Sequence, residues 1–383
     1  MESAENASKK RGLGQAIISG VLEAKLLVPT AHSSGNGKKF RVAVVGCGLI
    51  ARRSHIPAWK RMGVAITLVD LSQTALDSTG QRFEVDSRFR SLSDLFEHTS
   101  VDIVDIATPP DSHCDLAIAA LERGCHVIIE KPMCLTVEEV DRVLSVARSR
   151  DLKVGVCHDC LYLPAIQHAS EYLESGKAGR LNGLILRYLE WNSNPRLDDG
   201  GFWYRKLRGD IFYHIIPHVV YLSMKFLGDL EIVSVDTSKI SDTTLPFDQL
   251  NILMKTKTQQ YANIVMSSNS PGGWMEIEFI GERRNVRAGL AFYTFRGGIR
   301  EGALRPALDT ISENLSMFSS ITFSLLKGMI RWRSGKTTHF LLFNDFIASI
   351  GRRDPGKLPF LCSGEGSRRV VALTNEIAER LQT

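Results

Sequence analysis

The sequence lacks several features that define common protein classes. None of its apolar runs reaches the roughly 18–20 residues of a membrane-spanning helix. It has no basic stripe with interleaved aromatic residues, and its formal net charge is only +5. We therefore expect no nucleic acid among its partners. The N-terminus also lacks the charged-then-apolar pattern and the cleavage site of a secretory signal.

Cysteines are few and unevenly placed. Seven of them, an odd number at irregular spacing, indicate reduced thiols rather than a disulfide framework. This favours a reducing compartment, and we expect a cytoplasmic protein. Cys157 and Cys160 have C-x-x-C spacing in "CHDC", but one such pair without a second pair is not the pattern of a structural zinc site. We predict no metal.

The chain is too long for one ordinary domain. Its 383 residues, 44% of them hydrophobic, are enough for two buried cores. Residues 1–38 are rich in Ser, Gly and Lys at both ends, and we interpret them as a flexible extension. Regular patterning begins at Phe40.

Strands and helices alternate from Phe40 to Val156. Near-continuous apolar strands such as "FRVAVV" and "VDIVDIA" are typical of parallel strands buried on both faces. Helical segments separate them, and Thr136 with Glu139 forms a predicted capping box for one helix. This alternation predicts a parallel sheet with helices on both faces and right-handed crossovers.

The pattern changes after Cys157. From Leu181 to about Arg300 most segments are strand-like and joined by turn residues, with a helical stretch at about 215–227. The C-terminal "SRRVVALTNEIAERL" is an amphipathic helix. The predicted fold class is α/β plus α+β, an N-terminal parallel-sheet domain followed by a domain built on a mostly antiparallel open sheet.

A glycine-rich turn follows the first strand. Gly46, Gly48 and Ala51 have the G-x-G-x-x-G/A spacing, between a strand and a helix. The first glycine permits a tight turn, the second lets the backbone approach a pyrophosphate, and the small third residue allows close packing. The sequence therefore predicts a Rossmann dinucleotide-binding domain. Further candidates for cofactor contact within this turn are Cys47, Leu49 and Ile50.

Asp70 ends the second strand and favours one cofactor. A carboxylate there can accept hydrogen bonds from a ribose 2′-hydroxyl and would repel a 2′-phosphate. This predicts NAD. NADP stays open because Arg52 or Arg53 could reach toward that ribose.

The tripeptide Glu130-Lys131-Pro132 at the end of the fifth strand carries a resemblance. Together with "ATPPDSH", "HIPAWKRM", the antiparallel second domain and "LPFLCSGEGSRRVVAL", it resembles the glucose–fructose oxidoreductase, inositol dehydrogenase and rhizopine catabolism (Gfo/Idh/MocA) family. The resemblance covers residues 40–300 and 339–383. It implies an NAD(P)-dependent oxidoreductase that transfers hydride between nicotinamide and a carbinol of a sugar, nucleotide sugar or cyclitol. It also implies a homo-oligomer, dimer or tetramer, and cofactor contacts from Thr108, Pro109, His113, Glu130 and Lys131.

The resemblance and the pattern together predict the domains. The Rossmann domain spans 39–158, and a substrate and oligomerisation domain spans 159–345. A C-terminal loop and helix over 346–383 is expected to pack back on the Rossmann domain.

"YHIIPH" contains the other predicted catalytic residues. The family has a D-x-G-x-H motif here, which places His218 on its histidine, His214 on its aspartate and Ile216 on its glycine. The resemblance implies that Lys131 binds the reacting hydroxyl and that His218 is the general acid/base, as an imidazole near neutrality can be. His214 would orient the substrate, or relay duties would move to a residue such as Asp210. The structural alternative is a pair of helix-end histidines bonded to backbone carbonyls.

Pro217 decides against a metal site at this pair. Proline disfavours α conformation in the residue before it and is comfortable only in the first helical turn. We therefore expect His214 to lie before the helix, away from the face of His218, and no third ligand is indicated.

Substrate contacts are predicted on two further segments. The family's Arg-Phe-x-Pro rim corresponds to residues 161–164, where Tyr162 remains but the arginine is missing. Trp203, Arg205 and Asp210 lie in "GGFWYRKLRGD", and an aromatic ring and a cation there would suit a nucleotide sugar. Both residue types are equally ordinary at a sheet edge.

Residues 304–333 form an unusual insertion. Apolar residues at three-four spacing predict one helical stripe that ends in the basic and aromatic "KGMIRWR". It either packs on its own domain or subunit, or lies on an anionic membrane surface.

Two other functions stay open at this point. The altered D-x-G-x-H motif fits a non-catalytic NAD(P)-binding sensor or scaffold. A lyase or epimerase with a transient hydride step would show no net change in cofactor.

Overall fold

The structure, a computed structural model, describes residues 40–191, 203–242, 244–270, 274–289, 294–299, 337–350 and 358–381. All of these belong to one compact unit of the chain. The predictions for the extension 1–38 and for the insertion 304–333 fall outside the described residues.

The first sheet is parallel. Its strand order is β3-β2-β1-β4-β5-β6, and every pairing in it is parallel. The β4 strand is buried at all four positions and β1 at four of five, which explains their continuous apolar sequences. The strands are β1 (Arg41–Val45), β2 (Ala65–Val69), β3 (Arg88–Phe89), β4 (Ile103–Ile106), β5 (His126–Ile129) and β6 (Val154–Val156).

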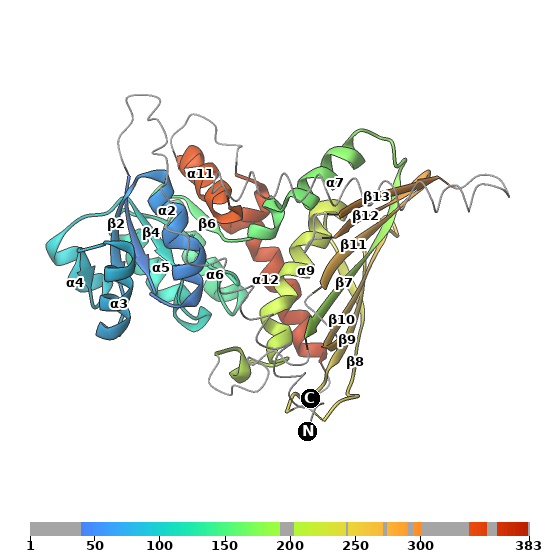
Figure 1. The fold of residues 1–383 in the computed structure, drawn as a ribbon, viewed down its shortest axis with the longest axis horizontal. Helices are drawn as coiled ribbons and strands as arrows, with labels where there is room; N and C mark the ends of the chain where they lie inside the picture. Colours follow the sequence, from blue (N-terminus) through green and yellow to red (C-terminus); the bar gives the residue numbers. More distant parts are fainter. Residues whose placement is uncertain are drawn as a thin grey trace, which may run out of the picture. The chain divides into compact units, whose positions relative to one another are not determined.

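Helices cover both faces of this sheet (Figure 1). Val42 and Val44 of β1 share an apolar cluster with Trp59, whereas Ala43 and Val45 share another with Leu121. The predicted parallel sheet and Rossmann architecture are confirmed. The helices and short turns are η1 (Ala51–His55), α2 (Ile56–Met62), α3 (Gln73–Phe83), α4 (Leu92–His98), η2 (Pro110–Ser112), α5 (His113–Glu122) and α6 (Val137–Ser149).

Side-chain caps fix where several of these helices begin. Ser72 caps α3, Ser91 caps α4, and Thr136 caps α6 through the backbone N–H of Glu139. The Glu139 carboxylate accepts a hydrogen bond from the Thr136 N–H in return, so the predicted capping box is present.

The second sheet is mixed but mostly antiparallel, as predicted. Among the described residues its order is β13-β12-β11-β7-β10-β9-β8, and only the central pair β7 and β10 is parallel. One apolar cluster continues from Val42 of the first sheet to Ala262 of the second. The strands are β7 (Leu181–Trp191), β8 (Glu231–Ser238), β9 (Gln249–Lys255), β10 (Tyr261–Ser270), β11 (Trp274–Gly281), β12 (Arg284–Gly289) and β13 (Thr294–Ile299).

The helix α9 (Ile211–Leu227) packs against β7 and β10 and corrects one prediction. It begins four residues earlier than the predicted helix, because the Asp210 carboxylate caps it by accepting the Ile211 N–H. Pro217 therefore lies inside the helix, and His214 lies on it rather than before it. The expectation drawn from proline was wrong, because residues 211–227 form one helix with Pro217 inside it. The Lys131 ammonium donates to the His214 carbonyl at 2.8 Å.

Three short 3-10 turns and three α-helices complete the elements of the described residues. The helix α11 contacts α2 and η3, while α12 contacts α6, α9 and β8. The predicted boundary between residues 345 and 346 falls inside α11 and separates no elements. These elements are η3 (Asp159–Tyr162), α7 (Pro164–Glu174), η4 (Trp203–Lys206), α11 (Thr338–Ile350), η5 (Phe360–Cys362) and α12 (Gly364–Arg380).

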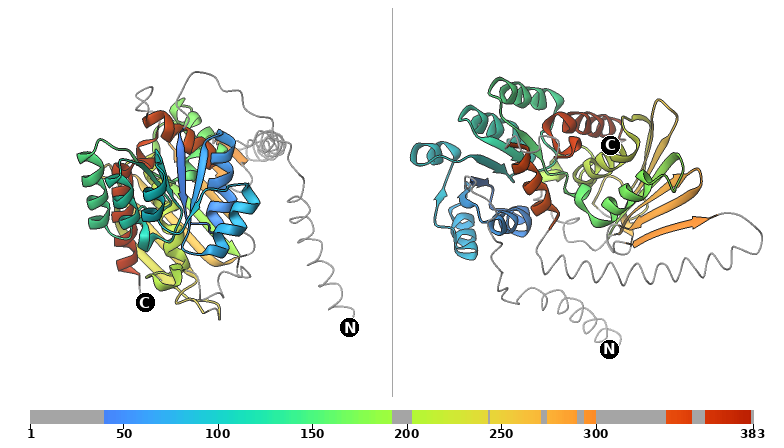
Figure 2. Two further views of the ribbon diagram at one scale, coloured as in Figure 1. Left: turned by 90° about the vertical axis from the view of Figure 1, so that its left-hand side faces the viewer. Right: turned by 90° about the horizontal axis from the view of Figure 1, so that it is seen from above.

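The helix α12 connects the two halves of the unit. Arg368 makes a bidentate pair with Asp141 of α6, and Arg369 pairs with Asp229, just before β8. Figure 2 shows α12, in red, beside α6 from another side. Just before this helix, Ser363 forms an antiparallel bridge with Gly155 of the edge strand β6.

None of the helices in the described ranges is both long and apolar enough to cross a membrane.

Candidate functional site

The glycine turn has the geometry that a dinucleotide needs. Gly46 has φ +98°, and a Cβ there would lie 2.7 Å from the Ala107 carbonyl oxygen, so only glycine fits. A Cβ on Gly48 would meet no atom of the chain within 4 Å, which leaves room for a pyrophosphate beside the backbone. The Arg52 N–H bonds to the Gly48 carbonyl, so a helix N-terminus opens at this point.

A π-helical turn follows and directs His55 inward. The Ile56 N–H bonds to the Ala51 carbonyl, five residues back. Pro57 has no N–H to offer the carbonyl four residues before it, and the wider turn accommodates this loss. His55 is fully buried as a result.

Asp70 lies against the glycine turn. Its Oδ2 accepts the Cys47 N–H at 2.7 Å and its Oδ1 accepts the Ser72 N–H at 2.8 Å. Leu49 and Ile50 of the glycine turn are exposed apolar residues. Cys47 is buried, and burial together with Asp70 raises the pKa of its thiol to about 11.

The predicted cofactor residues of segment 107–113 differ in exposure to solvent. Pro109 is exposed and Thr108 half-buried, with the Thr108 hydroxyl 2.7 Å from the Ser112 hydroxyl. His113 is fully buried, and its nitrogens lie 2.9 Å from the Pro132 carbonyl and 2.8 Å from the Thr108 carbonyl. Neither nitrogen is left for the predicted direct cofactor contact. His113 instead ties this segment to Pro132.

The Glu130 carboxylate turns away from solvent into a polar network. Its Oε1 lies 2.9 Å from His55 Nε2, and its Oε2 accepts the Lys131 backbone N–H at 3.1 Å. The histidines His55 and His339 and the local hydrogen bonds hold the pKa of Glu130 well below its usual value, although burial alone would raise it. Its contact with the cofactor stays a prediction, and the bonds that the structure shows are to His55 and to the Lys131 N–H.

Lys131 and His214 are brought together from different halves of the chain. The Lys131 Nζ lies 3.1 Å from His214 Nδ1 and donates to the His214 carbonyl at 2.8 Å. Lys131 is only 8% exposed. Burial lowers its pKa to about 8, against the opposing effect of Glu130.

His218 lies one helical turn from His214 and faces the same site. The two ring centroids are 6.5 Å apart. The His218 Nδ1 lies 2.7 Å from the Tyr221 hydroxyl, which also accepts the Cys160 N–H at 3.3 Å. Burial, and next the positive Lys131, lowers the pKa of His218 well below its usual value, so the imidazole is neutral at pH 7.

Arg205 and Asp210 pair with one another. Arg205 donates to Asp210 Oδ2 at 2.7 Å and to the Thr244 hydroxyl at 2.9 Å. The other Asp210 oxygen caps α9 through the Ile211 N–H. The predicted substrate or relay role of Asp210 therefore competes with two structural bonds.

The structure gives one of two further predicted substrate residues, Tyr162, a structural partner. Tyr162 is buried, and its hydroxyl donates to Asp345 Oδ2 of α11 at 3.0 Å, so the structure gives this hydroxyl a different partner. The prediction for the Trp203 side chain falls outside the described residues.

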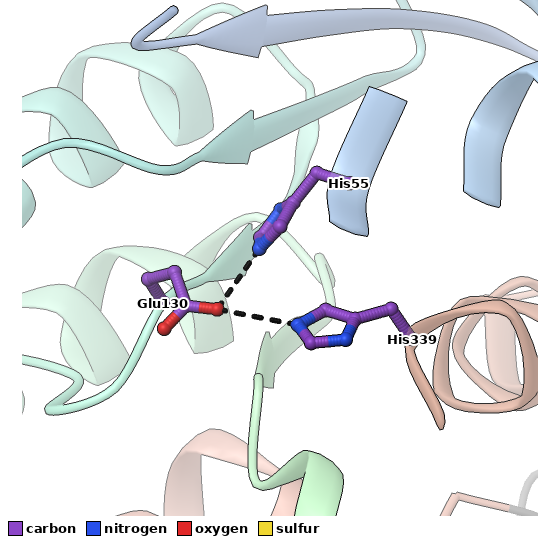
Figure 3. A group of neighbouring side chains, drawn as sticks. All are labelled: His55, Glu130 and His339. Carbon is purple, nitrogen blue, oxygen red and sulfur yellow. Dashed lines mark hydrogen bonds and ion pairs between the residues drawn. The ribbon is translucent and has the colours of Figure 1, made fainter. Parts of the chain in front are cut away.

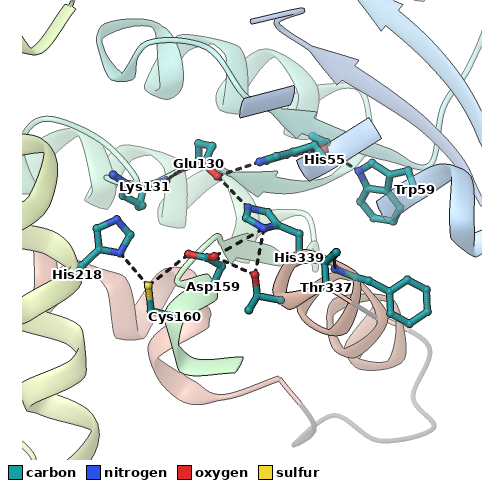
Figure 4. A network of polar contacts seen from close by, with 12 residues as sticks. His55, Trp59, Glu130, Lys131, Asp159, Cys160, His218, Thr337 and His339 are labelled. Atoms are coloured by element: carbon teal, nitrogen blue, oxygen red, sulfur yellow. Dashed lines mark hydrogen bonds and ion pairs between the residues drawn. The ribbon is translucent and has the colours of Figure 1, made fainter. Parts of the chain in front are cut away.

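A polar chain that the sequence interpretation missed continues from His218 into the Rossmann half (Figure 4). The Cys160 Sγ lies 3.5 Å from His218 Nδ1 and 3.8 Å from Asp159 Oδ1. Asp159 Oδ2 is in turn 3.7 Å from His339 Nδ1. Only Tyr221 offered a signal, since it stands three residues after His218 on one helical face; Asp159 and His339 are brought together only by the fold.

Comparisons with known proteins agree with this arrangement. Residues 40–158 match the model of an oxidoreductase family with an NAD-binding Rossmann fold, and residues 166–287 match the GFO/IDH/MocA C-terminal domain.

Curated relatives include two dehydrogenases. The chain is 29% identical to D-apiose dehydrogenase of Paraburkholderia graminis over 219 residues, and the match covers 57% of each chain. It is 23% identical to myo-inositol 2-dehydrogenase of Thermotoga maritima, over 65% of this chain and 75% of the other. The match thus spans less than two thirds of the D-apiose dehydrogenase.

Solved structures share the fold over a longer span. The WlbA dehydrogenase from Bordetella pertussis, in complex with NADH and UDP-GlcNAcA, superposes with a TM-score of 0.70 at 19% identity, over 91% of this chain and 96% of that one. An oxidoreductase from Agrobacterium radiobacter, in complex with NAD+, L-tartaric acid and magnesium, superposes with a TM-score of 0.69 at 19% identity, over 90% and 96%. With both family models matched in chain order on the two sheets, the chain belongs to the Gfo/Idh/MocA family of oxidoreductases.

Proposed function

We propose that this protein is an NAD-dependent dehydrogenase or reductase that acts on a carbinol of a sugar, nucleotide sugar or cyclitol. One observation carries the proposal. A buried lysine that follows β5 lies 3.1 Å from His214, one helical turn before His218, and the glycine turn follows β1 of the same parallel sheet.

The residues around the turn fit NAD. The open space at Gly48 and the helix that follows suit a pyrophosphate, and the Asp70 carboxylate suits two free ribose hydroxyls. Asp70 would repel the 2′-phosphate of NADP. This supports NAD over NADP, although Arg52 and Arg53 lie on the same turn.

Bound NAD supplies a hydride acceptor at nicotinamide C4. The chain supplies the other half of the reaction. As hydride leaves the carbinol carbon, the hydroxyl group on that carbon must lose its proton. Lys131 would hold the hydroxyl oxygen and stabilise its developing negative charge. His218, neutral at pH 7, would accept the proton on Nε2.

The Tyr221 hydroxyl lets His218 act in this way. To accept a proton on Nε2, the imidazole must carry its first proton on Nδ1. The Tyr221 oxygen, 2.7 Å away, can accept a hydrogen bond from that Nδ1–H and hold the same geometry before and after proton transfer. Tyr221 is thus a positioning residue for this step.

The substrate class follows from the relatives and from the site. The curated relatives are named for D-apiose and for myo-inositol, and a structural neighbour holds UDP-GlcNAcA. All three carry secondary hydroxyl groups, which suit a lysine and a pair of histidines. We also propose a cytoplasmic homo-oligomer, dimer or tetramer, and the seven free thiols support the reducing location.

The test is a panel of pentoses, hexoses, inositols and UDP-sugars with NAD and NADP. Formation of NADH is followed by absorbance and products by mass spectrometry. We expect turnover with at least one compound, a preference for NAD, and loss of turnover in Lys131→Met. Lys225→Met, an exposed lysine on α9, is the matched control and should behave as wild type.

Two outcomes would overturn the proposal. Tight NAD binding without turnover on the whole panel would favour a sensor or scaffold, the alternative that the replacement of the family aspartate by His214 motivates. A changed product without net NADH would identify a lyase or epimerase. Light scattering on the purified protein tests the oligomer separately.

A further inference from the structure

A second cluster of donor atoms lies behind Lys131, inside the protein. His55, Glu130 and His339 come from η1, the end of β5 and α11, and all three are buried (Figure 3). Glu130 Oε1 lies 2.9 Å from His55 Nε2 and 3.5 Å from His339 Nε2. One donor atom from each residue lies within 4.8 Å of the other two.

These separations suit a small metal ion. Zinc binds histidine nitrogen and carboxylate oxygen at about 2.0–2.2 Å, which places neighbouring tetrahedral ligands roughly 3.3 Å apart. The two measured separations lie on either side of that value. Two histidines and one carboxylate form a known zinc donor set, whereas magnesium prefers oxygen alone.

A carboxylate bonds to the other nitrogen of His55 and lies near the other nitrogen of His339. His55 Nδ1 lies 2.9 Å from Asp105 Oδ1, and Trp59 donates to Asp105 Oδ2 at 2.7 Å. His339 Nδ1 lies 3.7 Å from Asp159 Oδ2. Both Nε2 atoms therefore point at Glu130. Metal-ligating histidines characteristically have such a carboxylate on the nitrogen opposite the ion.

An independent observation concerns His339. Its Nε2 is buried, yet within the described ranges it makes no hydrogen bond. Glu130 Oε1 lies 3.5 Å from it, which is too long for a good hydrogen bond, and a poorly satisfied buried polar atom calls for an explanation. A cation between His55, Glu130 and His339 would satisfy this nitrogen.

The local charge also favours a cation. Three carboxylates, those of Asp105, Glu130 and Asp159, lie within 4 Å of nitrogens of the two histidines. In the metal-free protein a proton on His55 can bridge Asp105 and Glu130. That proton forms no hydrogen bond with His339 Nε2, whereas the ion would bind this nitrogen directly.

We propose that His55, Glu130 and His339 bind a divalent first-row transition metal ion, with zinc as the expected occupant. The three donors fill three tetrahedral positions, and a water molecule fills the fourth. The ion would join α11 to η1 and to the end of β5. Because the Glu130 carboxylate also accepts the Lys131 N–H, the ion would fix the backbone immediately before Lys131.

The proposal does not depend on the proposed dehydrogenase activity, because its readouts are metal content and spectra. Full-length protein, free of a histidine tag, is stripped with chelator and titrated with zinc. We expect about one zinc per chain and a higher melting temperature, as for any ligand that binds only the folded state.

His339→Gln tests the assignment against a matched control. It should weaken zinc affinity on the order of tenfold or more. His98→Gln replaces an exposed histidine on α4 and should bind zinc as wild type does.

Spectroscopy on the unmutated protein separates this site from a rival. Asp159, Cys160 and His218 form a second group of three donors within 4.8 Å, but that group contains a thiol. Cobalt(II) at the proposed site should show no thiolate charge-transfer band, and X-ray absorption of the zinc form should show nitrogen and oxygen ligands only. This measurement still decides the matter if His339→Gln fails to fold.

Three results would overturn the proposal. The first is no stoichiometric zinc uptake by the stripped protein. The second is a sulfur ligand in either spectrum, which would place the ion at Cys160. The third is unchanged zinc affinity in folded His339→Gln.

Discussion

Replacing His218 by asparagine should separate proton transfer from folding and from cofactor binding. The asparagine amide nitrogen occupies nearly the position of Nδ1. It can therefore keep the contact to the Tyr221 hydroxyl, which lies 2.7 Å from Nδ1 in the unmutated protein. It has no equivalent of Nε2 and cannot carry a proton. A positioned general base contributes about 10²–10⁴-fold to rate, or about 3–5 kcal/mol of barrier. We expect kcat to fall by that factor.

The assay is steady-state kcat at saturating substrate, with NAD affinity measured by calorimetry on the same preparation. NAD affinity should stay within about twofold, because His218 lies on α9 and the glycine turn lies after β1. His98→Asn, on the surface of α4, is the control for a histidine change as such. A kcat within threefold of wild type would refute the assignment of His218. Lys131 or His214 would then be the next candidate, rather than Asp210, whose oxygens already pair with Arg205 and cap α9.

Three further predictions concern the turn, the tyrosine and acid stability. Gly46→Ala should destabilise the protein by about 1–3 kcal/mol in urea unfolding, because its Cβ would lie 2.7 Å from the Ala107 carbonyl oxygen. Gly48→Ala should be as stable as wild type but bind NAD more weakly, because its Cβ would contact no atom of the chain and would occupy the space proposed for the pyrophosphate. Equal stability of the two variants would contradict the geometry. Tyr221→Phe should cost about 1–3 kcal/mol of stability and lower kcat more than it changes KM, because it removes the hydroxyl that bonds to His218 Nδ1 and to the Cys160 N–H. An unchanged kcat would remove Tyr221 from the mechanism. Burial lowers the pKa of His158 from 6.5 to about 4. Neutral His158 therefore contributes about 3 kcal/mol to the free energy of unfolding above pH 6.5, and this contribution is lost as pH falls toward 4. Urea unfolding at pH 7 and pH 5 should show a smaller pH effect in His158→Gln, and an equal effect would assign the acid sensitivity to other groups.

The Rossmann half was predictable from sequence because its determinants are local. Buried parallel strands are apolar throughout, the glycine turn has a fixed spacing, and Thr136 and Glu139 stand at capping-box distance. The second sheet was harder. Alternating residues identify β7 and β10 as strands, but no local pattern shows that these two pair in parallel.

The site was predictable only in part, for the same reason. Lys131 and His218 follow from a tripeptide and a motif position, yet the partner of each is distant in the chain. The local rule for Pro217 failed because α9 packs against β7, β10 and α12, and contacts with such distant segments lie outside any local rule. His339 carries no sequence signal at all, since its neighbours His55 and Glu130 lie more than 200 residues away.

The helix α12 has a consequence for folding during synthesis. It follows both sheets in the chain, and the segment just before it bridges Gly155 on the edge strand β6. A nascent chain therefore completes the Rossmann strands while the β6 edge still has open backbone groups, a template for pairing with other chains. Until Ser363 and the arginines of α12 leave the ribosome, this edge is exposed to association with neighbouring nascent chains. Substitutions that weaken the pairs of Arg368 with Asp141 and Arg369 with Asp229 should therefore reduce soluble yield more than they reduce the stability of protein already folded.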